Sequence, residues 1–101
     1  MMADPKLQKI WMTAAANLRH ARQMLPDNVS PDKLVQFDEY LDHNELGLAM
    51  HELEHIGRQQ KCSDGFWRNM QRAADTMNLT KDAESYRQEL NSTLDHPDVD
   101  G

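Results

Sequence analysis

Apolar residues recur along most of the chain at steps of three and four positions, the spacing that places them on one face of an α-helix. This pattern predicts five helices, at about residues 5–24, 31–42, 45–59, 64–77 and 81–94. No stretch alternates apolar and polar residues with the two-residue period of a strand. The sequence therefore predicts an all-α fold, a compact bundle of four to five short helices without a sheet.

The segments between these helices carry start and stop signals. Pro26 cannot continue a helix and so ends the first one. Ser30 followed by Pro31 is typical of an N-cap and a first helical position, and it starts the second helix. The N-caps expected for the later helices are Asn44, Ser63 or Asp64, and Thr80. A chain of 101 residues can bury one modest core. Residues 1–94 are therefore expected to form a single domain, and the acidic, Pro-containing residues 95–101 a disordered tail.

The apolar face of each predicted helix is expected to supply the core. The third helix contributes Leu46, Ala49, Met50, Leu53 and Ile56, and the fourth contributes Phe66, Trp67, Met70, Ala73, Ala74 and Met77. The other expected core residues are Leu7, Ile10, Trp11, Ala14, Leu18, Ala21, Leu25, Leu34, Phe37, Leu41, Tyr86, Leu90 and Leu94. On a wheel of about 100° per residue, His51 and His55 lie roughly opposite the core arc of the third helix. Leu48 lies on their side, so an apolar residue is expected on the outer surface.

No apolar run approaches the roughly 18 residues of a membrane span, and the amino terminus lacks the apolar segment of a signal peptide. Cys62 is the single cysteine, so it cannot form an internal disulfide or half of a Cys-x-x-Cys motif. These features predict a cytoplasmic protein without a membrane segment.

The net charge is −6, which argues against direct binding of nucleic acid, because nucleic-acid-binding proteins usually carry a clustered basic surface. The charge is distributed unevenly. Between Leu34 and Gly57 there is no Lys or Arg, whereas six carboxylates gather there: Asp38, Glu39, Asp42, Glu45, Glu52 and Glu54. Such a surface either keeps a small protein soluble or receives a basic protein. The residues expected to bind a partner are Asp38, Asp42, Glu45, Leu48, Glu52 and His55, with Leu48 as an apolar anchor.

The motif His51-Glu52-Leu53-Glu54-His55 offers a different chemistry. Two histidines four positions apart point the same way on a helix, and zinc peptidases use this spacing to hold Zn²⁺, with the intervening Glu52 as general base. A catalytic zinc also needs a third protein ligand and a sheltered cleft. Candidate third ligands are His43, Asp75 and Glu84, but none follows the motif at a usual spacing. The match is therefore interpreted as fortuitous, with no cofactor expected and zinc as the alternative.

Two longer strings resemble a known family. The stretch EYLDHNELGLAMHELEHIG, followed after a short gap by FWRNMQRAADTMNL, is similar to the helical immunity proteins of bacterial toxin–immunity systems. The match covers residues 37–79, and Asn44-Glu45-Leu46-Gly47-Leu48-Ala49 is its most specific part. The resemblance implies a cytoplasmic inhibitor that binds a cognate toxin, often a nuclease with a basic cleft, and blocks its active site. The longer basic first helix and the HELEH motif depart from the family pattern.

The sequence is thus interpreted as a small acidic protein-binding domain, an immunity-type inhibitor of a bacterial toxin. The alternatives are a small zinc-dependent hydrolase using His51, Glu52 and His55, and a generic helical adaptor. The partner expected is a basic protein such as a nuclease toxin, with neither nucleic acid nor a membrane bound directly. The basic residues of the first helix (Lys6, Lys9, Arg19 and Arg22) could also pair with the acidic residues of a second copy, which would make a homodimer.

Overall fold

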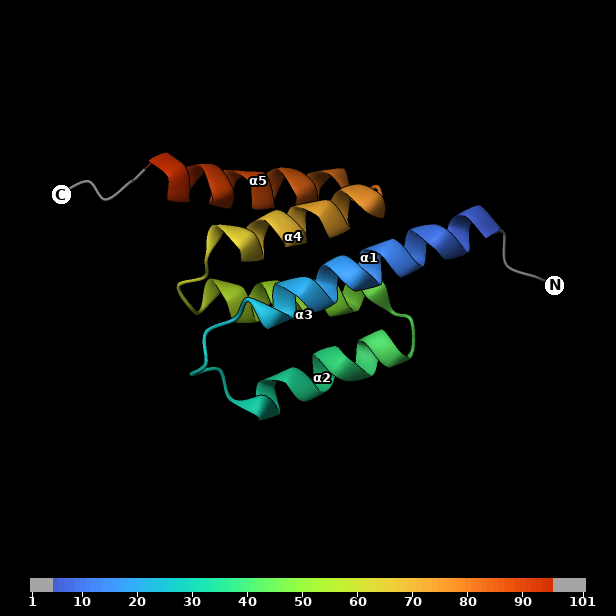
Figure 1. Ribbon diagram of the computed structural model, residues 1–101, viewed down its shortest axis with the longest axis horizontal. Coiled ribbons are helices and arrows are strands. Elements are labelled where there is room, and N and C mark those ends of the chain that lie inside the picture. Colours follow the sequence, from blue (N-terminus) through green and yellow to red (C-terminus); the bar gives the residue numbers. More distant parts are fainter. Residues whose placement is uncertain (1–4, 96–101) are drawn as a thin grey trace.

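The computed structural model describes residues 5–95, and the side chains of residues 8–92. This range holds five helices and no strand, which confirms the predicted all-α fold (Figure 1). The helices are α1 (Pro5–Gln23), α2 (Pro31–Asp42), α3 (Leu46–Arg58), α4 (Asp64–Thr76) and α5 (Thr80–Asp95). Asp95 is the last residue of α5, and the rest of the predicted disordered tail lies outside the described residues. No helix in the described range is long and apolar enough to cross a membrane.

The helices pack as neighbouring pairs around one core. α1 packs against α4, α4 against α5, and α2 against α3, and α1 also contacts α3. Figure 1 shows α4 and α5 along one edge of the bundle and α2 along the other, with α1 and α3 between them. Every helix contributes buried residues to a single hydrophobic cluster. α3 is therefore the middle helix of the five in sequence, and it also lies near the centre of the bundle.

Two of the predicted helix caps are confirmed. The side chain of Ser30 accepts a hydrogen bond from the Asp32 N–H at 3.3 Å, and Pro31 is the first residue of α2. The side chain of Ser63 accepts from the Phe66 N–H at 3.4 Å and caps α4. In both cases a Ser oxygen satisfies a backbone donor that has no partner within the helix.

The predicted caps at Asn44 and Thr80 are wrong, for related reasons. Asn44 ends α2 instead of starting α3: it has φ 59°, and the next N–H, that of Glu45, donates to the Tyr40 carbonyl at 2.8 Å. Asn78 closes α4 with φ 64° in the same way. This is the Schellman arrangement, and Asn suits it because it tolerates the left-handed conformation. Each turn leads almost directly into the next helix, so α3 follows Glu45, whose side chain makes no capping bond, and α5 begins at Thr80 itself.

The predicted core is largely confirmed. Each expected core residue of α3 is buried, as are those of α4, whereas Met77, the C-cap residue directly after α4, is half-buried. Ile10 is an exception, being 38% exposed near the start of α1. The residues found half-buried are Trp11, Leu25, Leu34, Leu41, Met77 and Leu90. The side chains of Leu7 and Leu94 lie outside the described set. Burial is thus strongest in α3 and α4 and weaker at the ends of α1 and α5.

Phe66, on α4, lies very close to the backbone of α3 at Gly57. A Cβ atom placed on Gly57 would lie 2.4 Å from Phe66 Cε2 and 2.6 Å from Cζ, well inside van der Waals contact. Phe66 is fully buried and meets Trp67 edge to face, with ring centroids 4.8 Å apart. The ring therefore has little room to move aside. Glycine is required at position 57 by packing, and not by backbone conformation, since its φ is not positive.

We predict that Gly57→Ala destabilises the protein by about 1–3 kcal/mol, because the new methyl group overpacks the core against Phe66. Gly47→Ala is the matched control in the same helix. A Cβ there meets nothing within 4 Å, so alanine should stabilise α3 by up to about 1 kcal/mol through helix propensity. Urea unfolding measures both values. Equal stability of the two variants would contradict the packing role of Gly57.

Candidate functional site

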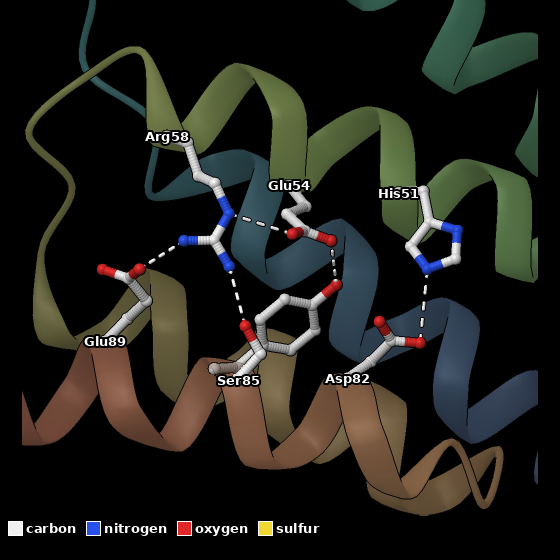
Figure 2. Close-up of polar contacts among 7 residues, drawn as sticks. His51, Glu54, Arg58, Asp82, Ser85 and Glu89 are labelled. Atoms are coloured by element: carbon white, nitrogen blue, oxygen red, sulfur yellow. Dashed lines mark hydrogen bonds and ion pairs between the residues drawn. The ribbon is translucent and has the colours of Figure 1, made fainter.

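A row of polar side chains joins α3 to α5. We call it the α3–α5 seam, and it consists of His51, Glu54 and Arg58 from α3 and Asp82, Ser85, Tyr86 and Glu89 from α5 (Figure 2). The two sets have the same spacing of three and four residues, so each forms one stripe along its helix. α3 and α5 are not among the closely packed helix pairs. Long polar side chains therefore make the link between them.

Arg58 is the most connected residue of the seam. Its Nε donates to Glu54 Oε2 at 2.9 Å, Nη2 donates to Ser85 Oγ at 2.9 Å, and Nη1 pairs with Glu89. The guanidinium also lies 5.4 Å from the ring centroid of Trp67, within range of a cation–π interaction. Partial burial disfavours the charge, but the bonds to Glu54 and Glu89 outweigh it and raise the pKa of Arg58. One charged side chain thus ties α3 to α5 and to an α4 aromatic ring.

Tyr86 connects the seam to the core. Its side chain is fully buried, and its hydroxyl donates a hydrogen bond to Glu54 Oε1 at 2.7 Å. The ring lies 5.8 Å from that of Trp67, centroid to centroid. Burial, followed by the bond to Glu54, raises the pKa of Tyr86 well above its usual range. The hydroxyl therefore remains a donor at any physiological pH and fixes the position of the Glu54 carboxylate.

The two histidines of the HELEH motif are exposed, as the helical wheel predicted. His51 Nε2 lies 3.2 Å from Asp82 Oδ2, and His55 Nε2 lies 3.3 Å from Gln59 Nε2. Within the described residues, the side chains that gather at His51 are Glu54 and Asp82. One ligating atom from each of these three residues lies within 4.8 Å of the other two. The candidate third ligands His43, Asp75 and Glu84 do not belong to this group, nor do His55 and Glu52.

The six residues expected to bind a partner lie on two faces. Asp38 and Asp42 line a groove between α1 and α2, together with Arg19 and Arg22. Arg22 holds Asp38 through two bonds, Nε to Oδ1 at 3.0 Å and Nη2 to Oδ2 at 3.1 Å. The remaining four residues form a stripe along the outer surface of α3, which we call the Leu48 stripe: Glu45, Leu48, Glu52 and His55. Leu48 is 50% exposed, as expected for a surface anchor.

Cys62 is half-buried in the segment between α3 and α4, and its Sγ donates weakly to the Gly57 carbonyl at 3.6 Å. Burial raises the pKa of its thiol. The thiolate, which is the reactive form, is therefore disfavoured at neutral pH, and Cys62 has the environment of a structural thiol.

Comparison of the chain with protein-family models, with curated proteins and with solved structures finds no match. Sequence reasoning missed Asp82, Ser85, Tyr86 and Glu89 as partners of α3, although their spacing repeats that of His51, Glu54 and Arg58. It counted Glu54 among the acidic residues of the segment, whereas Glu54 bonds both Arg58 and Tyr86.

We predict that Tyr86→Phe lowers the free energy of unfolding at pH 7 by about 1–3 kcal/mol, because Glu54 loses a charged hydrogen bond. The pH dependence should also change. The pKa of Tyr86 is raised by folding, so its contribution is fully present below about pH 10, where the unfolded tyrosine ionises, and is lost at higher pH.

Above about pH 10, the free energy of unfolding of the wild type should fall by up to about 1.4 kcal/mol per pH unit through ionisation of the unfolded tyrosine. This component should be absent in Tyr86→Phe. Urea unfolding between about pH 8 and 11.5 measures both curves, and other groups titrate alike in the two proteins. Parallel curves would show that Tyr86 ionises as readily in the folded state as in the unfolded one.

Proposed function

We propose that the protein is an immunity-type inhibitor that binds a cognate bacterial toxin and neutralises it. The partner is a basic protein, such as a nuclease with a cleft for phosphate, and the acidic surface of α2 and α3 occupies that cleft. The observation that carries the proposal is the exposed Leu48, which lies among carboxylates in a segment without Lys or Arg.

The Leu48 stripe has the composition of a docking surface. Leu48 lies between Glu45 and Glu52 along the stripe. Neither carboxylate makes a hydrogen bond or ion pair within the described part of the chain. Carboxylates without internal partners are available to a partner's cations. Complementary charge of this kind steers association, and an apolar side chain at the centre can supply much of the affinity.

The acidic residues of α2 contribute unequally to this proposal. Asp42 is exposed at the end of α2, next to the turn that leads to Glu45. Asp38 is held by Arg22 through both carboxylate oxygens, so a partner's cation must displace Arg22 first. We expect Asp42 and Glu45 to contribute more to binding than Asp38.

The test begins with capture of partners from an extract of the source organism on the immobilised protein, at low and high salt. The captured protein is then expressed alone and together with this chain. We expect it to stop growth when expressed alone, and the wild type to restore growth. Leu48→Arg and the double variant Asp42→Lys, Glu45→Lys should each weaken binding by at least about tenfold and lose the protection.

Asp75→Lys is the control, because Asp75 is an exposed acidic residue of α4 outside the proposed surface. It should bind and protect like the wild type. Binding that survives reversal of Asp42 and Glu45 would instead favour a helical adaptor that recognises its partner through other residues. A captured protein that has no effect on growth would contradict the inhibitor function directly.

A further inference from the structure

We propose that His51, Glu54 and Asp82 form a binding site for a divalent transition-metal ion, with Zn²⁺ as the best fit, and that the ion fastens α3 to α5. This site differs from the HELEH zinc site considered from the sequence, because it uses Glu54 and a residue of α5 in place of Glu52 and His55. It does not depend on the proposed inhibitor function.

The geometry is close to that of a bound ion. A tetrahedral Zn²⁺ with ligands about 2.0–2.2 Å away holds neighbouring ligand atoms about 3.3–3.6 Å from one another. The distance from His51 Nε2 to Asp82 Oδ2 is 3.2 Å, and the Glu54 atom completes a group that spans no more than 4.8 Å. His51 is exposed and the two carboxylates are half-buried, so the side chains can close by the remaining distance. Figure 2 shows His51 and Glu54 on α3 facing α5, with Asp82 below His51.

The donor set suits the ion. One imidazole nitrogen and two carboxylate oxygens are ordinary ligands of Zn²⁺, and three protein ligands leave a fourth position for water. The charges around the three ligand atoms also favour a cation. Glu54 is paired with Arg58, whereas Asp82 is paired within the described residues only with His51. A divalent ion between them would place a permanent positive charge beside both carboxylates.

Glu54 is already oriented as a metal ligand usually is. Ligating carboxylates are commonly held by hydrogen bonds from neighbouring residues, and those bonds affect affinity. Glu54 accepts one from the buried Tyr86 hydroxyl and one from Arg58. Each carboxylate oxygen has a second lone pair, so these bonds leave acceptor capacity for an ion. Tyr86 and Arg58 are positioning residues for this site.

The experiment is calorimetric titration of the untagged full chain with Zn²⁺, together with the thermal midpoint in the presence and absence of the ion. We expect one ion per chain and a midpoint raised by several degrees, because an ion that binds the folded state stabilises it. His51→Ala, Glu54→Gln and Asp82→Asn should each weaken binding by at least about tenfold, and Tyr86→Phe should weaken it without changing the stoichiometry. Urea unfolding of each variant without metal shows whether it is folded.

Two histidine variants make the test specific. His43→Ala removes an exposed histidine whose Nδ1 lies 2.9 Å from the Glu39 carbonyl oxygen, away from the seam, and it should bind Zn²⁺ like the wild type. His55→Ala should do the same. If His55→Ala abolishes binding while Glu54→Gln and Asp82→Asn do not, the ion is held by the histidine pair of α3 alone and the proposal is wrong. Absence of binding to the wild type would also overturn it.

Discussion

The structure depends on the contact between the Phe66 ring and the bare backbone of α3 at Gly57. Because no side chain separates them, α4 lies closer to α3 there than a helix bearing a larger residue would allow. Phe66 then fixes Trp67 through an edge-to-face contact, and Trp67 in turn lies against Tyr86 of α5. The order of these rings sets where the Tyr86 hydroxyl emerges from the core. It emerges at Glu54, one turn before Gly57 on the same helix.

The polar seam is therefore a consequence of the apolar core. A carboxylate at position 54 would be costly beside a buried ring if it had no partners, since burying an unpaired charge is strongly unfavourable. Here one oxygen accepts from Tyr86 and the other from Arg58, and Arg58 remains partly exposed to water. The network is satisfied: among the described residues that are not exposed, no buried side-chain nitrogen or oxygen atom lacks a hydrogen-bond partner. Satisfied networks of this kind favour one register between two helices over its neighbours.

Much of this fold could be predicted from the sequence, because it is encoded locally. The three- and four-residue periodicity of α3 and α4 identified their buried faces, and Ser30 and Ser63 act as caps through atoms two or three residues away. Asn44 was misassigned because Asn is common both as an N-cap and in left-handed turns, and only the position of the Tyr40 carbonyl decides between them. The pairing of Glu54 with Tyr86 could not be predicted, because the two residues are 32 positions apart and meet only through the relative placement of α3 and α5.

α3 presents three different surfaces, and this division explains why the HELEH motif admitted competing interpretations. Leu53 belongs to the buried arc, His51 and Glu54 belong to the seam, and Glu52 and His55 belong to the Leu48 stripe. Spacing along one helix alone suggests that these residues form one site. In the folded protein the neighbouring helices cover them differently, so they lie in three separate environments. His51 and His55 lie one turn apart, so the seam and the stripe share a border there. A partner that covers the Leu48 stripe would therefore also contact the edge of the seam. The position of α5, which the seam holds against α3, would then affect the shape of the surface that the partner contacts.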